Sequence, residues 1–378
     1  MSLRPARRIA GVRRTLIREI FDSAPADAIN LGLGQPDLPT PPSICAAGRR
    51  AIADGRTGYT STAGDPALRA AVAARYPGQA SGPGNVLITV GSQEAMFATC
   101  LALVDPGEEV LYPDPAYPAY PAVARLVGAR GVPYPLSSAN GFRIDPREVE
   151  QRITERTRLV IVCEPSNPTG AISRDEDLAR LAGTLGERGI PWVSDEIYSE
   201  FAYDRTFSSM ACHAPGRGLV ISGLSKDVSM TGWRIGWIVA PEEMVVRLTA
   251  VHQYLVTCAS SISQAAALAA FTPEGEAERR EHVEIFRHRR RLMAEELGRV
   301  PGISFKPPDG AFYYFVDVSE HGASRDLARR LLERRNVVVI PGEAFGERGH
   351  GFLRISFAAA DDRIRAGIRA LAAELAGE

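Results

Sequence analysis

The sequence has the length, composition and charge of an ordinary globular protein: 378 residues, 45% of them hydrophobic and 24% charged, with a formal net charge of −1. A chain of this length exceeds what one hydrophobic core usually supports, so two domains are expected. The near-zero charge provides no basic surface for nucleic acid or an anionic membrane, and no run of about 18 apolar residues predicts a transmembrane helix. The five cysteines are scattered without a CxxC pattern, so we expect free thiols in a cytoplasmic protein and no metal site.

The first 240 residues contain an alternation of short β-rich runs and helical stretches that begins near residue 85. Before it, a helix over about 5–22 and an extended Pro-rich piece over 35–42 are expected. Strands are expected at 86–90, 109–112, 158–163, 191–194, 219–222 and 234–239. Helices are expected at 92–104, 117–127 and 173–188, and one long helical run follows Pro241 to about 271. The pattern predicts βαβ units, and therefore an α/β fold with a mostly parallel sheet flanked by helices.

The character of the chain changes after Pro273. The expected elements are a charged helix at 276–299, strands at 303–305 and 312–316, a helix at 324–335, strands at 337–340 and 352–357, and a C-terminal helix from Asp361. This order is typical of a separate, smaller α+β domain. We assign residues 42–272 to a large domain, and residues 1–41 with 273–378 to a smaller, discontinuous one.

Lysine is rare in this chain. Of 44 lysines and arginines only two, Lys226 and Lys306, are lysines. An amine can lose its proton and form an imine, whereas a guanidinium stays charged. Lys226 ends the segment Ser222-Gly223-Leu224-Ser225-Lys226, eight residues before Arg234, which indicates a Schiff-base lysine beside a phosphate site; the alternative is an ordinary surface lysine. Lys306 precedes two prolines in a polar context, so we expect it to be solvated.

Two further candidate positions directly follow predicted strands, where ligands bind in open α/β sheets. Ser92 and Gln93 open the helix after strand 86–90, and amides at a helix N-terminus bind phosphate well; Ser92 alone is equally typical of a plain helix cap. Asn167 follows strand 158–163. A single Asn-Pro is common in turns, but the complete Asn-Pro-Thr-Gly string is more specific.

Asp195 ends the strand at 191–194, and Tyr198 follows three residues later. An unpaired buried carboxylate is costly, so Asp195 needs a partner. A protonated ring nitrogen would be such a partner, and a role as a helix N-cap is the alternative.

The segment from Ser222 to Arg234 offers the donors that a phosphate dianion needs. Ser222 and Ser225 supply hydroxyl groups, and Arg234 supplies a charged fork. Trp233 and Trp237 are more typical of packing residues than of cofactor contacts. The segment therefore predicts a phosphate site next to the reactive lysine.

Together these strings resemble the class I/II aminotransferases, the fold-type-I enzymes that use pyridoxal 5'-phosphate (PLP). The resemblance runs nearly end to end, over residues 32–37, Tyr59 in 58–60, 91–93, Tyr117 in 115–118, 167–170, 195–198, 226–234 and 352–356. One such string is weak evidence, but eight in the same order are specific. The resemblance implies a large PLP-binding α/β domain and a smaller α+β domain.

The resemblance also implies a role for each matching residue. Lys226 would form the imine with PLP and act as the general base, Asp195 would pair with the pyridinium nitrogen, and Asn167 and Tyr198 would hydrogen-bond the ring's phenolic oxygen. Tyr117 would stack on the ring. The phosphate would be held by the residues Ser92, Gln93, Ser222, Ser225 and Arg234. Tyr59 would reach the phosphate of a neighbouring subunit, so a homodimer is expected.

Arg354, with the backbone of Gly34 and with Asn167, would hold the α-carboxylate of the substrate by the same resemblance. The fork of an arginine matches both oxygens of a carboxylate, and the resulting orientation contributes much of the rate. Some aspartate-preferring members carry a lysine where this chain has Gln93. We therefore expect a neutral aliphatic, methionine-like or aromatic amino donor and a 2-oxo acid acceptor, although Arg13, Arg14 and Arg18 leave acidic donors open.

Three rival functions share parts of this pattern. A PLP-dependent β-lyase or 1-aminocyclopropane-1-carboxylate synthase would use the same lysine, aspartate and arginine. A non-enzymatic regulator would need a winged-helix module, for which the residues before Gly32 are too few. A nicotinamide dehydrogenase would need Gly-x-Gly-x-x-Gly after its first strand, and the string at 91–94 does not fit. A transaminase with a ping-pong mechanism is the favoured interpretation.

Overall fold

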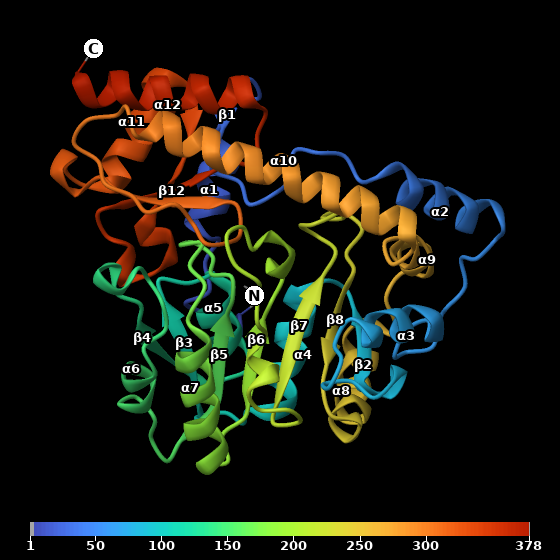
Figure 1. Cartoon of the computed structure of the whole chain (residues 1–378). Helices are drawn as coiled ribbons and strands as arrows, with labels where there is room; N and C mark the ends of the chain where they lie inside the picture. Colours follow the sequence, from blue (N-terminus) through green and yellow to red (C-terminus); the bar gives the residue numbers. More distant parts are fainter. Residues whose placement is uncertain (1–3, 378) are drawn as a thin grey trace.

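The computed structural model of the protein describes residues 4–377. Figure 1 shows a lower part built around one large sheet and an upper part crossed by a long helix. Residues 1–3 and 378, which the sequence assigns to the smaller domain, lie outside the described residues. No helix within residues 4–377 is both long and apolar enough to cross a membrane.

The large sheet has seven strands in the order β2-β8-β7-β6-β5-β3-β4, and only β8 runs antiparallel to its neighbours. The strands are β2 (Val86–Thr89), β3 (Glu109–Asp114), β4 (Arg130–Pro135), β5 (Thr157–Cys163), β6 (Trp192–Asp195), β7 (Gly218–Gly223) and β8 (Gly236–Val239). The expected mostly parallel sheet is confirmed. Strand β4 was not expected; it contains Pro133 and Pro135, and it lies at the sheet edge, where proline is tolerated.

Helices cover both faces of this sheet (Figure 1). They are α3 (Pro66–Ala74), α4 (Ser92–Leu103), α5 (Ala119–Leu126), α6 (Pro146–Glu150), α7 (Asp175–Glu187) and α8 (Glu242–Val256), while α2 (Pro42–Ala53) and α9 (Ser261–Ala269) pack against each other to one side of the sheet. Strand β5 shows why both faces are covered: Val160 and Val162 belong to one hydrophobic cluster, Leu159 and Ile161 to the other. Successive strand side chains point to opposite faces, so a strand that is apolar at every position needs cover on both.

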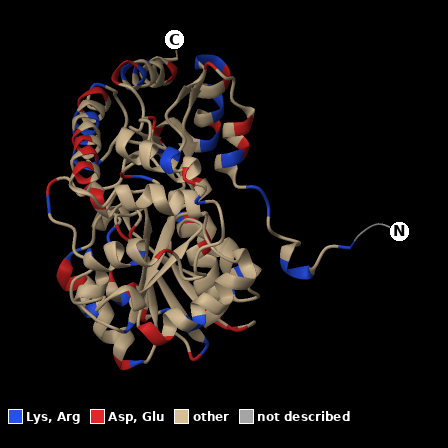
Figure 2. Ribbon diagram, turned by 90° about the vertical axis from the view of Figure 1, so that its right-hand side faces the viewer, with Lys and Arg blue, Asp and Glu red and all other residues tan. Residues whose placement is uncertain are grey.

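Two expected helices differ in the structure. The run after Pro241 is not one helix, because Thr257 adopts φ 68° and the hydroxyl of Ser260 accepts a bond from Ser263 N to start α9. The helix expected over 5–22 is shorter: α1 spans Leu16–Ser23 and is capped by Thr15, whose side chain accepts from Arg18 N. Residues 4–15 are exposed, and Figure 2 shows the N-terminal segment extending away from the body.

The upper part contains the N-terminal elements and everything from residue 273 onward. Its elements are α1, β1 (Ile29–Asn30), α10 (Pro273–Leu297), β9 (Tyr313–Asp317), α11 (Ser324–Arg335), β10 (Val337–Val338), β11 (Ile340–Pro341), β12 (Phe352–Ser356) and α12 (Asp361–Ala376). Strands β11, β12 and β9 form an antiparallel sheet, and β1 pairs in parallel with β10. A separate hydrophobic cluster fills this part. The cluster also includes Ile197, Tyr198, Phe201 and Tyr203 from the lower part, so the division at 41/42 and 272/273 stays a prediction.

The predictions of two strands in the upper part were wrong in their extent. At 303–305 only Ser304 forms a bridge, to Asp317, because prolines at 307 and 308 prevent a longer ladder. The strand expected at 337–340 is split, since Val337 pairs with Ile29 in one sheet and Ile340 pairs with Arg354 in another. Residues 337–340 thus connect the N-terminal segment to β12, the strand that carries Arg354.

Candidate active site

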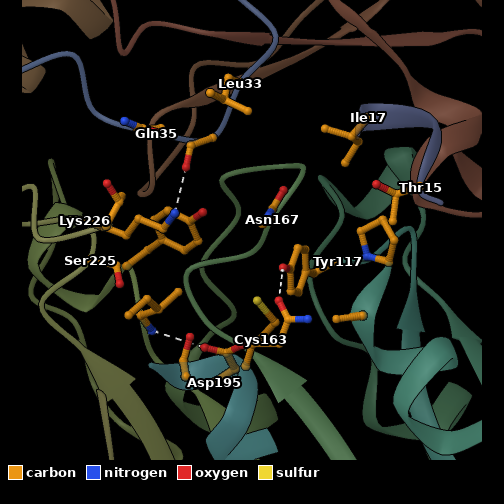
Figure 3. A pocket seen from close by; sticks show the side chains of 18 of the residues that line it. Thr15, Ile17, Leu33, Gln35, Tyr117, Cys163, Asn167, Asp195, Ser225 and Lys226 are labelled. Carbon is orange, nitrogen blue, oxygen red and sulfur yellow. Dashed lines mark hydrogen bonds between the residues drawn. The ribbon is translucent and has the colours of Figure 1, made fainter. Parts of the chain in front are cut away.

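A cavity of about 590 Å³ opens at the carboxyl ends of the parallel strands, below the upper part. Most of the residues predicted from the sequence line it: Gly34, Ser92, Gln93, Tyr117, Asn167, Asp195, Tyr198, Ser225, Lys226, Arg234 and Arg354. Figure 3 shows Lys226, Asn167, Tyr117 and Asp195 around one common space. Residues up to 320 positions apart in the sequence therefore meet at one site.

Lys226 enters the cavity from the turn that follows β7. Its Nζ donates to the carbonyl oxygen of Gly34 at 2.7 Å and lies 5.7 Å from the ring centroid of Tyr198. Burial lowers the pKa of Lys226 to about 8, and the positive charge of Arg354 adds to this effect, while Asp195 opposes it. About a tenth of this amine is therefore neutral at pH 7, far more than for an ordinary lysine, and the neutral form is the nucleophile.

Asp195 lies at the floor of the cavity, at the end of β6. Its Oδ2 accepts from the hydroxyl of Tyr120 at 2.8 Å, and its Oδ1 accepts from Ile197 N at 3.3 Å. Burial raises the pKa of Asp195 to about 6, although these bonds and Lys226 act in the opposite direction. No ion pair to Asp195 is found within the described residues. A buried carboxylate of this kind fits a cationic ligand atom.

Tyr120 is a site residue that the sequence reasoning missed. It lies in α5, three residues after Tyr117, and both side chains line the cavity with their rings edge to face at 5.8 Å. Tyr117 itself precedes this helix, but in the helix expected over 117–127 residues three apart would share one face. This spacing was the signal that could have identified Tyr120 once Tyr117 was singled out.

The N-terminus of α4 and Arg234 form an anion-binding corner. Gly91 adopts φ 80° directly before Ser92, and a Cβ on Gly91 would lie 2.5 Å from Nη2 of Arg234, so only glycine allows this approach. Arg234 donates to the carbonyl oxygens of Thr231 and Val90 at 3.0 and 3.3 Å. The free amides of a helix N-terminus beside a guanidinium suit a phosphate group.

Arg354 is only 2% exposed and points into the cavity from β12. Its Nη1 donates to Asn167 Oδ1 at 2.9 Å, and its Nη2 donates to the carbonyl oxygen of Gly32 at 2.6 Å. Its guanidinium carbon lies 4.3 Å from the ring centroid of Tyr313 and 4.6 Å from that of Phe345, and within residues 4–377 its Nε has no partner and the side chain forms no ion pair. A buried guanidinium without a carboxylate partner fits an anionic ligand group.

Tyr313 is a second residue that the sequence did not reveal. Its hydroxyl lies 2.8 Å from that of Tyr198, and a Cβ on Gly34 would come within 2.3 Å of it. It belongs to the aromatic run 312–315, which by itself indicates only a hydrophobic core. Tyr117 donates from its hydroxyl to Gln93 Oε1 at 3.1 Å.

Two predicted residues lie outside the lining of the cavity. The hydroxyl of Ser222 donates to the carbonyl oxygen of Glu196 at 3.1 Å, on the far side of β7, which removes the support for a phosphate contact. Tyr59 is 88% exposed in the loop between α2 and α3, so a contact across a subunit interface stays a prediction.

These groups fit PLP. Asp195 offers a buried, unpaired carboxylate for a pyridinium nitrogen, and Lys226 offers an amine for the aldehyde. The α4 N-terminus and Arg234 suit its phosphate, while Arg354 remains for the carboxylate of an amino acid. The donor set therefore matches both the cofactor and the substrate class.

Comparison with known proteins gives the same answer. The model of the family "Aminotransferase class I and II" matches residues 26–371. The aspartate aminotransferase of Pyrococcus horikoshii is 37% identical over 99% of this chain and 97% of its own, and a probable N-acetyl-LL-diaminopimelate aminotransferase of Bacillus subtilis is 39% identical over 90% and 88%. The crystal structure of an aromatic aminotransferase from Pyrococcus horikoshii superposes with a TM-score of 0.89 at 31% identity, covering 96% and 99% of the two chains. This chain belongs to the class I and II aminotransferases and is a PLP-dependent aminotransferase.

Proposed function

We propose that this enzyme transfers the amino group of a neutral L-amino acid, aliphatic, methionine-like or aromatic, to a 2-oxo acid such as 2-oxoglutarate or pyruvate. The observation that carries the proposal is a group of uncharged side chains in the lining of the cavity. Ile17 and Leu33 contribute apolar side chains, Tyr117 contributes a ring, and Gln93 is uncharged. A donor whose side chain is apolar would bury it here without leaving a charge unpaired.

Most basic side chains of this cavity have another proposed role, so few remain to bind a second carboxylate of the substrate. Arg354 and Arg234 are placed for the α-carboxylate and the phosphate, and Lys226 for the imine. Arg18 is the remaining arginine in the lining; its Nε lies 3.4 Å from Asp22 Oδ1, and its guanidinium carbon lies 5.4 Å from the ring centroid of Phe21. Asp22 pairs with Arg14 as well as with Arg18, so it neutralises Arg18 only in part, and the proposal of a neutral donor rests on the uncharged side chains of the lining.

An acidic donor is the second candidate. Two of the relatives above are named for aspartate and for an acylated diaminopimelate, both of which carry a further carboxylate. Arg18 would have to leave Asp22 to bind it. The side chain of Arg18 is 59% exposed, so this exchange costs little energy.

The proposed roles of the residues follow from their positions. Bound PLP supplies an aldehyde for the amino group and a ring that withdraws electrons from Cα. Lys226 removes the α-proton and holds it, Asp195 keeps the ring nitrogen protonated, and Arg354 fixes the substrate so that the breaking bond has the right direction. The aromatic rings of Tyr117 and Tyr313 exclude water from the reacting atoms. The reaction is ping-pong, with the first product leaving before the second substrate binds.

We further propose a homodimer in which Tyr59 contributes to the partner's phosphate site. The support is the set of large apolar side chains that the single chain leaves exposed, including Tyr59 at 88%, Tyr254 at 89% and Val246 at 67%. Sedimentation of the enzyme tests this proposal, and a monomer at micromolar concentration would contradict it. The cytoplasmic location also stays a prediction.

A donor screen by half-reaction tests the proposed substrate. Each amino acid is mixed with the PLP enzyme without an acceptor, and the loss of the visible cofactor band is followed. We expect faster loss with leucine, methionine or phenylalanine than with aspartate or glutamate, and less than a twofold change in Arg18→Gln. Faster reaction with acidic donors, abolished in Arg18→Gln, would favour the second candidate. Release of pyruvate and ammonia without an acceptor would indicate a β-lyase.

A further inference from the structure

A second cavity lies behind the loop that carries Asn167. It has a volume of about 360 Å³, within the range of small-molecule sites. Thr169 and Ala171 line this cavity, whereas Asn167, two residues earlier, lines the first. The other walls come from the turn at 138–142 in the lower part and from residues 304–309 in the upper part. The cavity therefore lies at the junction of the two parts, separate from the site described above.

One wall of the second cavity is aromatic. The rings of Phe315 and Phe352 are stacked, with centroids 4.8 Å apart and an interplanar angle of 4°. Phe142 stands edge-on to both, at 5.3 Å from each. All three residues line the cavity. Such a wall offers a flat apolar surface against which a further ring can pack.

Phe142 is held in an unusual backbone conformation. Its φ is 58°, in the left-handed region, directly after Gly141 at 63°. For a bulky residue this conformation is unfavourable. The amide of Phe142 donates to Ser137 O at 2.8 Å, which closes the turn and fixes the ring on the cavity wall. Strain of this kind is common where a side chain is placed for binding.

Lys306, the second lysine of the chain, provides the positive charge of this cavity. It is exposed, as expected, and its Nζ lies 3.2 Å from where a Cβ on Gly141 would be. Among residues 4–377 it takes part in no ion pair. Its ammonium is therefore available to a ligand beside the aromatic wall.

The carboxylates of Asp309 and Asp317 also line the cavity, and they differ in their ionic partners. Asp309 is paired with Arg143, with Oδ2 and Nη2 3.1 Å apart. Asp317 accepts from the amide and the hydroxyl of Ser319, at 2.9 and 2.6 Å, but has no cationic partner within the described part of the chain. The lining thus presents one unpaired cation and one unpaired anion.

We propose that the second cavity binds an aromatic α-amino acid, with its carboxylate on Lys306, its ammonium on Asp317 and its ring against the three phenylalanines. A simple carboxylate would leave Asp317 beside an anion, and a simple amine would leave Lys306 beside a cation. The zwitterion matches both charges, and the ring matches the wall. The proposal is independent of which donor the first cavity accepts.

Equilibrium dialysis with L-phenylalanine tests this assignment. The PLP enzyme is first reduced with borohydride, which fixes the cofactor to its lysine and prevents turnover. We expect saturable binding that weakens about tenfold in Lys306→Gln and persists in Arg354→Gln. The matched control is Arg291→Gln, on the exposed surface of α10 and outside both cavities. Binding that is unaffected in Lys306→Gln, or lost in Arg354→Gln alone, would overturn the proposal.

The ammonium contact has a test of its own. Asp317→Asn keeps an acceptor for Ser319 but removes the negative charge. We expect it to bind L-phenylalanine about tenfold more weakly and 3-phenylpropionate, which has no ammonium group, more tightly than the wild type does. Parallel changes for both ligands would show that Asp317 shapes the cavity without contacting the ammonium, and would overturn the proposed pose.

Discussion

The two lysines of this chain line two different cavities, and their surroundings differ. Lys226 is enclosed among strand ends, bonded to the carbonyl of Gly34, with the charge of Arg354 nearby. Lys306 is exposed beside phenylalanine rings. The comparison shows that the residue type alone does not make an amine reactive. Desolvation and a neighbouring cation, both supplied by the fold, favour the neutral amine at Lys226.

The largest expected effect is at Lys226. We expect Lys226→Ala to lower kcat by at least about a thousandfold, because the variant loses both the amine that binds the cofactor and the base. Lys226→Arg is the matched control: it keeps the positive charge but cannot form an imine. Both variants should lack the visible band of the lysine-bound cofactor. Activity near wild type in Lys226→Arg would show that only the charge matters.

The next effect is at Arg354, which lines the first cavity. We expect Arg354→Gln to raise the KM of the amino donor by about a hundredfold, since two charge-assisted bonds to the carboxylate are lost. Steady-state kinetics with a good donor measure this. Arg291→Gln should leave KM unchanged. An unchanged KM in Arg354→Gln would place the substrate carboxylate elsewhere.

The pH dependence of PLP capture tests the protonation state of the Lys226 amine. Burial lowers the pKa of Lys226 to about 8, and only the neutral amine attacks an aldehyde. The rate at which the cofactor-free enzyme captures PLP should therefore fall about tenfold per pH unit below 8 and level off above it. In Arg354→Gln the neighbouring positive charge is gone, so the pKa rises and the profile moves to higher pH. A profile that does not move would exclude Arg354 as a cause.

The smallest effect is expected at Tyr120. Tyr120→Phe removes one hydrogen bond to Asp195, so we expect kcat/KM to fall about threefold to tenfold. That bond lowers the pKa of Asp195, and its loss should raise this pKa further above about 6. The acid limb of the pH–rate profile should move to higher pH. A role in packing alone would lower the rate without moving the limb.

Much of the site was predictable because its residues follow strands. The sheet brings the ends of β5, β6 and β7 to one edge, so Asn167, Asp195 and Lys226 had to meet once the strands were recognised. The same alternation argues against Ser222: within β7 its side chain faces the opposite side, while Ser225 lies beyond the strand and lines the cavity. Strand periodicity therefore separates Ser222 from the lining of the cavity, and its contact with the phosphate stays a prediction.

The remaining features depend on contacts between distant segments. Tyr313 enters the cavity because Gly34, nearly 280 residues earlier, has no side chain to occupy its place. The shorter α1 and the split of 337–340 result from pairing with partners that no local pattern identifies. The second cavity likewise forms only where the two parts meet. Local periodicity carries no information on such contacts.

The segment around Gly32 and Gly34 has a consequence for how the enzyme responds to ligands. Its two carbonyl oxygens accept bonds from Arg354 and Lys226, the same cations that a carboxylate and an aldehyde would engage. A ligand that takes the Lys226 amine displaces the carbonyl oxygen of Gly34, which then needs a new donor or water. The N-terminal segment thus contacts both cations of the site through its backbone, and it leads back to α1, whose Ile17 borders the same space.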